Sequence, residues 1–473
     1  MRRSHFLQAS AGAMTVLTLP HLSSRALASD VVDYTLTAAP MRFSPAARIS
    51  FDGLAFNGSI PGPLLRIVHG QRLRAKFNNN TGQGSTIHWH GMILPNSMDG
   101  AEGVTQAAVR SGDSFVYEFL PDPPGTRWYH DHVSNGLLRG LFGMVIVEDP
   151  RDQVPDAEFA LVFHDVPRMS TVNPAMRGVG NAPMTDPLGS PELTQMPMDD
   201  KMGDEIAFIA HCINGAAYPN TKRLPVKVGQ HVRLRILNAN PTETRYVRLA
   251  GHRLVVTHSD GNPLPQPVEV DALRVGVAER YDAWFEVNAP GAWLLQGLSS
   301  DPLAYEQAAV VHTESMENAP PMASTESLEG VDYFTYQNAG GTAGALPPQG
   351  GAHYDFTLDD GKYGSSRWTI NGQTYPYTPK IFVHRNDIVS VRLLNKTDMD
   401  HPMHLHGHVF EITGIDDVAL ARPLPKDTSL VRANGGTLSW RFRADSPPGR
   451  WLLHCHNAIH MMDGMMTEVV YRA

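Results

Sequence analysis

The sequence predicts an all-β protein made of three consecutive β-sandwich domains of one type. A hairpin pattern occurs three times: an Asn-Gly pair, alternating apolar residues, a Gly or Asn turn and a second alternating strand. The pairs begin at Asn57, Asn214 and Asn371, which are 157 residues apart each time. The chain also contains 41 glycines and 36 prolines, and this abundance favours short strands and turns over long helices.

A second element follows each hairpin in the same order. A Pro-Gly turn leads into a short aromatic and aliphatic strand, in "PPGTRWYHDH" from Pro123, "APGAWLLQG" from Ala289 and "PPGRWLLHCH" from Pro447. Loops rich in Gly, Pro, Ser and Met, at about 167–203 and 313–351, separate the three copies. A length of 473 residues suits several domains. We place these domains at residues 29–152, 153–314 and 315–473.

The N-terminus predicts an export signal over residues 1–28. Arg2 and Arg3 precede an apolar, small-residue stretch that ends in an A-x-A cleavage motif. The paired arginines resemble a twin-arginine signal with the spacing off by one residue, so ordinary secretion stays open. A membrane anchor is the weaker alternative, because Pro20 and His21 interrupt a short apolar run. We expect an exported protein, periplasmic or secreted, without stable membrane insertion.

Charge and cysteine content limit the partners of this chain. The formal net charge is -9 and no basic stripe is present, which argues against nucleic acid as a partner. We expect a monomer that acts on small molecules. The chain has two cysteines, Cys212 and Cys455. An exported protein could pair them, but if Cys455 binds a metal, Cys212 becomes a small buried hydrophobe.

Four histidine clusters carry the chemistry, and each contains an H-x-H pair. Residues two apart on a strand point to the same face, so each pair aims two imidazoles at one place. In "HCH" the two histidines face one way and Cys455 faces the other, so this strand joins two different sites. The clusters are "HWHG" (His88, His90), "WYHDH" (His130, His132), "HPMHLHGH" (His401, His404, His406, His408) and "HCHNAIH" (His454, His456, His460).

The repeats separate ligand histidines from structural ones. When the Pro-Gly turns are aligned, His130 and His454 both correspond to Gln296 of the second copy. A metal ligand disappears where no metal binds, whereas a structural histidine persists, as His408 does at His252. We therefore predict that the middle domain is a spacer without metal. Domains one and three must then meet to build a site with several metals.

The ligand types indicate copper. Two histidines and a cysteine with a weak axial ligand form the blue-copper arrangement, and Cys455, His401 and His460 supply these three strong ligands. Zinc accepts the same ligands but performs no redox chemistry. Eight histidines remain, which suits three coppers with two or three imidazoles each: His88, His90, His130, His132, His404, His406, His454 and His456.

The four clusters, in this order, resemble those of the multicopper oxidases, which include laccases, ascorbate oxidase, bilirubin oxidase and bacterial copper-efflux oxidases. The resemblance covers nearly the whole mature chain and implies three cupredoxin-like Greek-key β-sandwich domains. It also implies four copper ions: one type 1, one type 2 and a type 3 pair. Type 1 copper would bind His401, Cys455, His460 and an axial Met465. Type 2 copper would bind His88 and His404. The type 3 pair would bind His90, His130, His132, His406, His454 and His456.

The resemblance further implies one-electron oxidation of a donor coupled to four-electron reduction of O₂ to water. Electrons would pass from type 1 copper through Cys455 to His454 and His456. An axial methionine lowers the type 1 potential, so we expect a laccase-type oxidase of phenols or aromatic amines. One alternative is a periplasmic cuprous oxidase for copper tolerance. A remote alternative is a copper-free structural cupredoxin protein.

Oxygen reduction needs protons, and Asp99 is the predicted relay. It lies nine residues after His90, where the family has a carboxylate beside the cluster. The alternative is a turn aspartate, because "MDG" is typical of turns. Bacterial relatives often carry a glutamate directly after the second type 1 histidine. Here that residue is Met461 and the nearest acid is Asp463, which leaves the second proton donor open.

Two further expectations concern the electron donor. We expect His401 and His460 to present exposed edges to it, because type 1 copper must lie near the surface. The first long loop is rich in methionine, whose soft thioether binds Cu(I), although methionine is also a common gap-filler in packing. We favour packing for these residues: Met169, Met176, Met184, Met196, Met198 and Met202.

Overall fold

The structure is a computed structural model. It describes residues 30–133, 135–168, 206–299, 307–324, 328, 330–346, 351–361 and 365–472. The predicted export signal and the methionine-rich part of the first long loop lie outside these residues. No helix among the described residues is both long and apolar enough to span a membrane.

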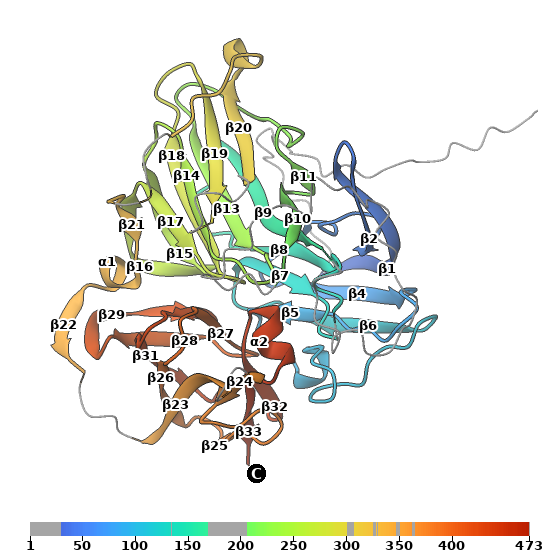
Figure 1. Cartoon of the computed structure of the whole chain (residues 1–473), viewed down its shortest axis with the longest axis vertical. Coiled ribbons are helices and arrows are strands. Elements are labelled where there is room, and N and C mark those ends of the chain that lie inside the picture. The colour runs from blue at the N-terminus through green and yellow to red at the C-terminus, as the bar shows by residue number, and fades with distance from the viewer. Residues whose placement is uncertain are drawn as a thin grey trace, which may run out of the picture.

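In the described residues the strands form six sheets, two for each predicted domain, and these pack as three β-sandwiches (Figure 1). In the first domain one sheet has the order β2 (Ile49–Phe56), β1 (Val31–Ala46), β4 (Arg72–Asn79), β6 (Ser114–Phe119). The other has the order β3 (Leu65–Val68), β8 (Phe142–Glu148), β7 (Gly125–His130), β5 (His88–His90).

The middle domain has a seven-stranded and a six-stranded sheet. The first has the order β11 (Ala216–Ala217), β10 (Phe208–Ile213), β9 (Ala157–Pro167), β13 (His231–Asn238), β18 (Arg280–Glu286), β15 (Leu254–Ser259), β16 (Asn262–Val270). The second has the order β12 (Leu224–Val226), β20 (Gln307–Thr313), β19 (Ala292–Leu298), β14 (Arg245–Leu249), β17 (Ala272–Val275), β21 (Tyr333–Phe334). β21 comes after residue 314, the predicted end of this domain, but pairs with β17 of the middle sandwich.

The third domain has a seven-stranded and a five-stranded sheet. The first has the order β22 (Thr342–Ala345), β29 (Val418–Lys426), β28 (Phe410–Ile415), β31 (Thr437–Arg443), β26 (Ile388–Asn395), β23 (Ala352–Gly361), β24 (Ser365–Ile370). The second has the order β25 (Ile381–Val383), β33 (Met466–Tyr471), β32 (Arg450–Cys455), β27 (His401–Leu405), β30 (Thr428–Val431). The helices are short: α1 (Tyr336–Gly340), α2 (Ala458–Met462), and the 3₁₀ turns η1 (Asn96–Met98) and η4 (Glu314–Met316).

Equivalent strands pair in the same way in all three domains. β1 lies parallel to β4, β9 to β13, and β23 to β26, and the opposite sheets contain the parallel pairs β3–β8, β12–β20 and β25–β33. These partners are not consecutive in the chain, so the connections cross between the two sheets of each sandwich, as in Greek-key topology. The predicted all-β chain with three consecutive sandwiches of one type is confirmed.

The repeated Asn-Gly pair shows why the three domains start alike. Asn57, Asn214 and Asn371 have positive φ angles of 51°, 50° and 52°, a conformation that asparagine tolerates better than most residues. Each side chain accepts a hydrogen bond of 2.6–2.8 Å from a backbone N–H of β1, β9 or β23, the strand that pairs with the one preceding the turn. The same residue therefore makes the turn and fixes it to the neighbouring strand.

Alternating burial builds the sandwich interiors. In β4, Leu73, Ala75 and Phe77 are buried, whereas Arg74 and Lys76 between them face solvent. The period of two places every second side chain in the space between the sheets.

The two histidines interpreted as structural occupy equivalent positions. Nδ1 of His408 lies 2.8 Å from the carbonyl of His406, and Nδ1 of His252 lies 3.0 Å from the carbonyl of Ala250. The ring of His252 packs edge-on against Trp293, with centroids 4.6 Å apart. Each ring donates to the carbonyl two residues earlier in the chain, which holds the same turn in both domains.

Strand pairing brings the histidine clusters together inside domains one and three. β5 pairs with β7 so that His88 lies opposite His130, and β27 pairs with β32 so that His404 lies opposite His454. In Figure 1 the ends of these strands meet where the first and third domains touch, and there His88 of β5 lies 3.4 Å from His404 of β27.

Candidate metal centres

The first metal-capable group lies inside the third domain and joins a thiol to two imidazoles. Sγ of Cys455 lies 3.5 Å from Nδ1 of His460 and 3.7 Å from Nδ1 of His401. His401 belongs to β27, Cys455 ends β32, and His460 belongs to α2. The hydroxyl of Thr397 lies 2.8 Å from Nε2 of His401, so Nδ1 of that ring faces the thiol. The donor set and spacing fit a soft, redox-active metal.

Met465 lies directly beside this group and is fully buried. The backbone N–H of Cys455 donates to the carbonyl of Met465 at 3.0 Å, and the N–H of Met465 donates to the carbonyl of His460 at 2.9 Å. The backbone therefore ties Met465 to two of the three strong ligands. Its role as the weak axial ligand stays a prediction.

The other eight predicted histidines meet between domains one and three. Pairs of Nε2 atoms face each other: His406 and His454 at 3.0 Å, and His88 and His404 at 3.4 Å. Their ligand atoms fall into three groups, two of which share His90, and in each group all atoms lie within 4.8 Å of one another. The groups are His88, His90, His404; then His90, His130, His456; then His132, His406, His454.

Burial keeps these imidazoles in the form that binds metals. Removal from water, followed by the charge of neighbouring histidines, holds the pKa of His90, His132 and His404 well below its ordinary value. Burial also lowers the pKa of His454 to about 4. A neutral imidazole offers a lone pair, whereas a protonated one does not.

Backbone carbonyls orient several of these rings. Nδ1 of His88 donates to the carbonyl of Asp99 at 2.8 Å, and Nδ1 of His130 donates to the carbonyl of Asp131 at 2.9 Å. Such outer hydrogen bonds fix the tautomer and leave Nε2 for the metal. Nε2 of His132 is buried without a hydrogen-bond partner among the described residues. A buried, unpaired imidazole nitrogen beside other imidazoles fits a metal site.

One strand connects the thiol group to the histidine groups. Cys455 belongs to the group with His401 and His460, whereas His454 and His456 belong to two different histidine groups. The alternation of side chains along β32 produces this division. The structure therefore places these residues as the sequence predicts, with two kinds of site joined through adjacent peptide bonds.

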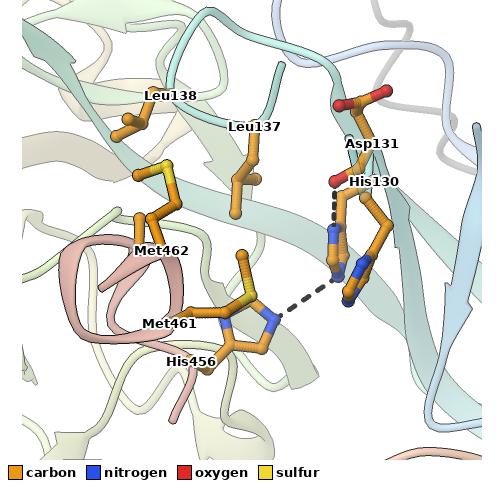
Figure 2. Close-up of a pocket in the computed structure, with 9 residues that line it drawn as sticks. His130, Asp131, Leu137, Leu138, His456, Met461 and Met462 are labelled. Carbon is orange, nitrogen blue, oxygen red and sulfur yellow. Dashed lines mark hydrogen bonds between the residues drawn. The ribbon is translucent and has the colours of Figure 1, made fainter. Parts of the chain in front are cut away.

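A small cavity opens beside the histidine groups at the contact between domains one and three (Figure 2). Its volume is about 10 Å³, room for roughly one water-sized molecule. Apolar side chains form the wall opposite the histidines, and the lining is His130, Asp131, His132, Leu137, Leu138, His456, Ala458, Met461 and Met462. Figure 2 shows Nε2 of His456 directed at Nε2 of His130, 3.4 Å away.

Asp99 reaches the same place from the first domain and is fully buried. Its Oδ2 accepts a hydrogen bond from Nδ1 of His406 at 3.0 Å, and its Oδ1 lies 3.3 Å from Nδ1 of His88. Oδ1 makes no hydrogen bond within the described part of the chain. Asp99 also ends η1 through its backbone N–H, so the turn role and contact with the site occur together.

The expectation that His401 and His460 present exposed edges is wrong. Both side chains are fully buried, and the indole of Trp368 contacts both rings. The Trp368 and His460 rings stack with centroids 3.8 Å apart and planes at 33°, and Trp368 meets His401 nearly edge-on at 5.5 Å. Trp368, in β24, is itself partly exposed. A partly exposed indole therefore contacts both histidines of the thiol group.

The sequence interpretation missed several residues that touch the site. Asp427 and Thr428 contact His90 and His404, and Trp368 covers His460. The run "KDT" places adjacent charges where β29 ends, but adjacent charges usually indicate exposed residues, so this signal is weak. The cysteines are as expected: Cys212 and Cys455 are both buried, and no disulfide joins them.

Comparison with known proteins adds independent information. Three family models, each described as multicopper oxidase, match residues 39–152, 192–315 and 347–473. The chain is 33% identical to multicopper oxidase MmcO of Mycobacterium tuberculosis, over 98% of this chain and 91% of that protein. It is 27% identical to Laccase-4 of Thanatephorus cucumeris, over 85% and 82% of the two chains. Its structure superposes on a multi-copper oxidase from Pseudomonas thermotolerans with a TM-score of 0.70 at 25% identity, covering 93% of this chain and 99% of that one.

Proposed function

The chain belongs to the multicopper oxidase family, and on that premise we propose that it is a laccase-type oxidase of phenols and aromatic amines. It is an oxidoreductase that uses copper, O₂ and a reducing substrate. The proposal adds the donor class and the location of each copper. The observation that carries it is the indole of Trp368 stacked on buried His460.

We assign the coppers from the groups of facing ligand atoms. His401, Cys455 and His460, with Met465 as the axial ligand, would hold type 1 copper, and His88 and His404 would hold type 2 copper. The type 3 pair would lie between two trios: His90, His130, His456 and His132, His406, His454. Bound in this way, the four ions supply one-electron oxidation of the donor and four-electron reduction of O₂ to water.

Trp368 is proposed to receive the donor. An indole face attracts other aromatic rings by stacking and dispersion, and a partly exposed indole offers such a face to solvent. The same ring keeps water from His460, because both type 1 histidines are fully buried beneath it. A phenol stacked on Trp368 would lie one aromatic ring away from a copper ligand.

Asp99 is proposed to hold the proton that oxygen reduction consumes. Its Oδ1 is free to carry a proton, and its Oδ2 stays bonded to His406. The carboxyl can therefore gain and release a proton without releasing the ring that it orients. The second proton donor is left open.

A metal-ion donor is the second candidate, because carboxylates lie near Trp368. Asp360 is the cross-strand neighbour of Trp368 in the β23–β24 pair. Partial burial, a hydrogen bond with Asp359 and the charges of Asp359 and Asp398 raise the pKa of Asp360, so the three carboxyls lie close together. Such a group attracts cations, which favours Cu(I) as an alternative donor. A copper-free structural protein would not account for the grouped histidine and cysteine ligand atoms.

Two variants distinguish the donors. Trp368→Ala should lower kcat/KM for a dimethoxyphenol by about two- to tenfold through lost stacking, and should affect Cu(I) oxidation less. Asp360→Asn should leave phenol oxidation unchanged and would lower Cu(I) oxidation only if Cu(I) is the donor. Phe382→Ala serves as the control, because Phe382 is an exposed aromatic of the same domain. A Trp368→Ala protein with wild-type phenol kinetics would exclude the proposed docking face.

Location and assembly also remain proposals. The arginine-containing N-terminal segment supports export to the periplasm or beyond. A monomer with O₂ and a small donor as its only partners is the simplest working unit, because the ligands of every proposed copper come from one chain.

A further inference from the structure

The segment Lys426-Asp427-Thr428, where β29 gives way to β30, contacts ligand histidines from two domains. Nε2 of His90, from the first domain, lies 3.1 Å from Oδ1 of Asp427 and 3.0 Å from Oγ1 of Thr428. Nδ1 of His404, from the third domain, donates to the carbonyl of Asp427 at 2.8 Å. One short segment therefore sets the orientation of two rings.

The segment Lys426-Asp427-Thr428 holds the ring proton on different nitrogens in His90 and in His404. A neutral imidazole carries one N–H, and at His90 the carboxylate of Asp427 holds that proton on Nε2. Nδ1 is then left with the lone pair, and this atom is buried without a hydrogen-bond partner among the described residues. At His404 the backbone carbonyl holds the proton on Nδ1, which leaves Nε2 toward His88. Asp427 thus determines which nitrogen of His90 is offered to the group with His130 and His456.

The middle domain holds Asp427 in place. The guanidinium of Arg280 donates to both carboxylate oxygens of Asp427, at 2.8 and 2.5 Å. Asp260 accepts hydrogen bonds from the backbone N–H groups of Asp427 and Thr428, at 3.3 and 3.1 Å. Arg127 of the first domain adds a third contact to Asp427, at 3.3 Å.

This arrangement is fully buried and specific in geometry. The side chains of Arg280, Asp260, Asp427 and Arg127 are at 0% exposure. A fork of two parallel N–H donors fixes the plane of a carboxylate as well as its position. Residues outside the third domain therefore fix the position of Oδ1, the oxygen that Arg280 shares with His90.

We propose that Arg280 and Asp260 of the middle domain are positioning residues for the histidine groups. Acting through Asp427, they hold the proton of His90 on Nε2, so that Nδ1 faces the metal. The middle domain contributes no side chain to the ligand groups found among the described residues, yet it sets the tautomer of a ligand and does more than separate its neighbours. The predicted effect on copper affinity rests on the proposed copper assignment. The predicted tautomer of His90 does not depend on that assignment.

The alternative is that Arg280 and Asp427 only join the domains as a buried ion pair. The chain offers a matched control in Arg233, a middle-domain arginine that is also buried and bonded to Asp282 at 2.5 Å. Its loss should cost stability in a similar way, but it contacts none of the ligand histidines.

The first test measures the tautomer in metal-free protein with ¹⁵N-labelled histidine rings, by long-range ¹H–¹⁵N correlation NMR. Wild type and Arg233→Met should carry the His90 proton on Nε2. In Asp427→Asn, which is nearly isosteric, Arg280 and Arg127 both donate to the Oδ2 position and favour the amide oxygen there, so the amide NH₂ faces Nε2 of His90. Asp427→Asn and Arg280→Met should therefore move the proton toward Nδ1 or give a mixture. If His90 stays protonated on Nε2 in folded Asp427→Asn and Arg280→Met, the positioning role is overturned. If Arg280→Met does not fold, Asp427→Asn still tests the role of the carboxylate, and Asp260→Asn tests the contribution of the middle domain.

The second test measures copper bound at the histidine groups, by chelator competition and metal analysis. Arg280→Met and Asp427→Asn should bind copper at the histidine groups about 10- to 100-fold more weakly, which is typical for lost outer-shell partners. The blue type 1 band should remain in both variants. Wild-type copper affinity in variants whose His90 tautomer has changed would overturn the link to metal binding. A wild-type protein without copper would overturn the assignment of function and leave the tautomer result standing.

Discussion

Replacing Asp99 with asparagine should stop oxygen reduction while leaving the copper sites assembled. Oδ2 of Asp99 accepts a hydrogen bond from Nδ1 of His406, and Oδ1, 3.3 Å from Nδ1 of His88, makes no hydrogen bond in the described structure. The amide oxygen of asparagine can replace the acceptor toward His406. The amide cannot carry a transferable proton, so only the relay is lost.

The expected loss follows from the surroundings of Asp99. A positioned acid or base contributes about 10²- to 10⁴-fold to rate. Asp427 also touches the histidine groups, but Arg280 engages both of its oxygens. The carboxyl of Asp131 points away from the rings of His130 and His456 in Figure 2. Because Asp427 is held by Arg280 and Asp131 points away, neither of these described acids is placed to substitute. Turnover should fall by about 10³-fold, or roughly 4 kcal/mol of activation free energy.

Three measurements check this prediction: copper content, the rate at which a donor bleaches the blue band without O₂, and steady-state O₂ consumption. Only steady-state O₂ consumption should fall in Asp99→Asn, whereas copper content and the bleaching rate should stay at their wild-type values. Asp99→Glu, which restores a carboxyl group, should recover part of the rate. An Asp99→Asn protein with full copper and more than about a tenth of wild-type turnover would refute the relay.

Two further predictions concern the thiol site and acid stability. Cys455→Ser should remove the blue band and oxidase activity together, because a hydroxyl does not replace the soft thiolate. Absorption spectra and copper analysis test this prediction. A variant that stays blue would exclude Cys455 as a ligand. Burial lowers the pKa of His164 to about 4, below its unfolded value of about 6.5. As pH falls, His164 therefore takes up its proton in the unfolded state before it does so in the folded state. The free energy that neutral His164 contributes to folding is complete above pH 6.5 and is lost as pH falls toward 4. His164→Gln keeps an acceptor for the N–H of Gly215 and should reduce the loss of unfolding free energy between pH 7.5 and 4.5 by about 2–3 kcal/mol in denaturant titrations. An unchanged loss would contradict the buried, neutral state of His164.

Local geometry explains what the sequence predicted correctly. The period of two along a strand settles that His454 and His456 share one face and that Cys455 takes the other, whatever the rest of the fold does. The Asn-Gly pairs specify left-handed turns through the residue types themselves, as the positive φ angles of Asn57 and Asn371 show. Such features depend on residues one to four positions apart, so the sequence is sufficient for them.

Contacts between distant parts of the chain could not be predicted in this way. Trp368 covers His460 because β24 packs against α2, and no alternation along either segment indicates that contact. The expected exposure of His401 and His460 was wrong for this reason. The sequence predicted that His401, Cys455 and His460 form one group, but not which aromatic side chain packs against it.

The sequence by itself determined the three sandwiches, the histidine pairs and the residue types at each candidate site. Only the tertiary structure decided which nitrogen of each ring faces the site. That choice at His90 depends on Asp427, which lies 337 residues away in the chain, and through it on Arg280 in a third domain. Buried charges are stable only where their partners meet them. The packing of three domains, rather than any local pattern, brings these partners together.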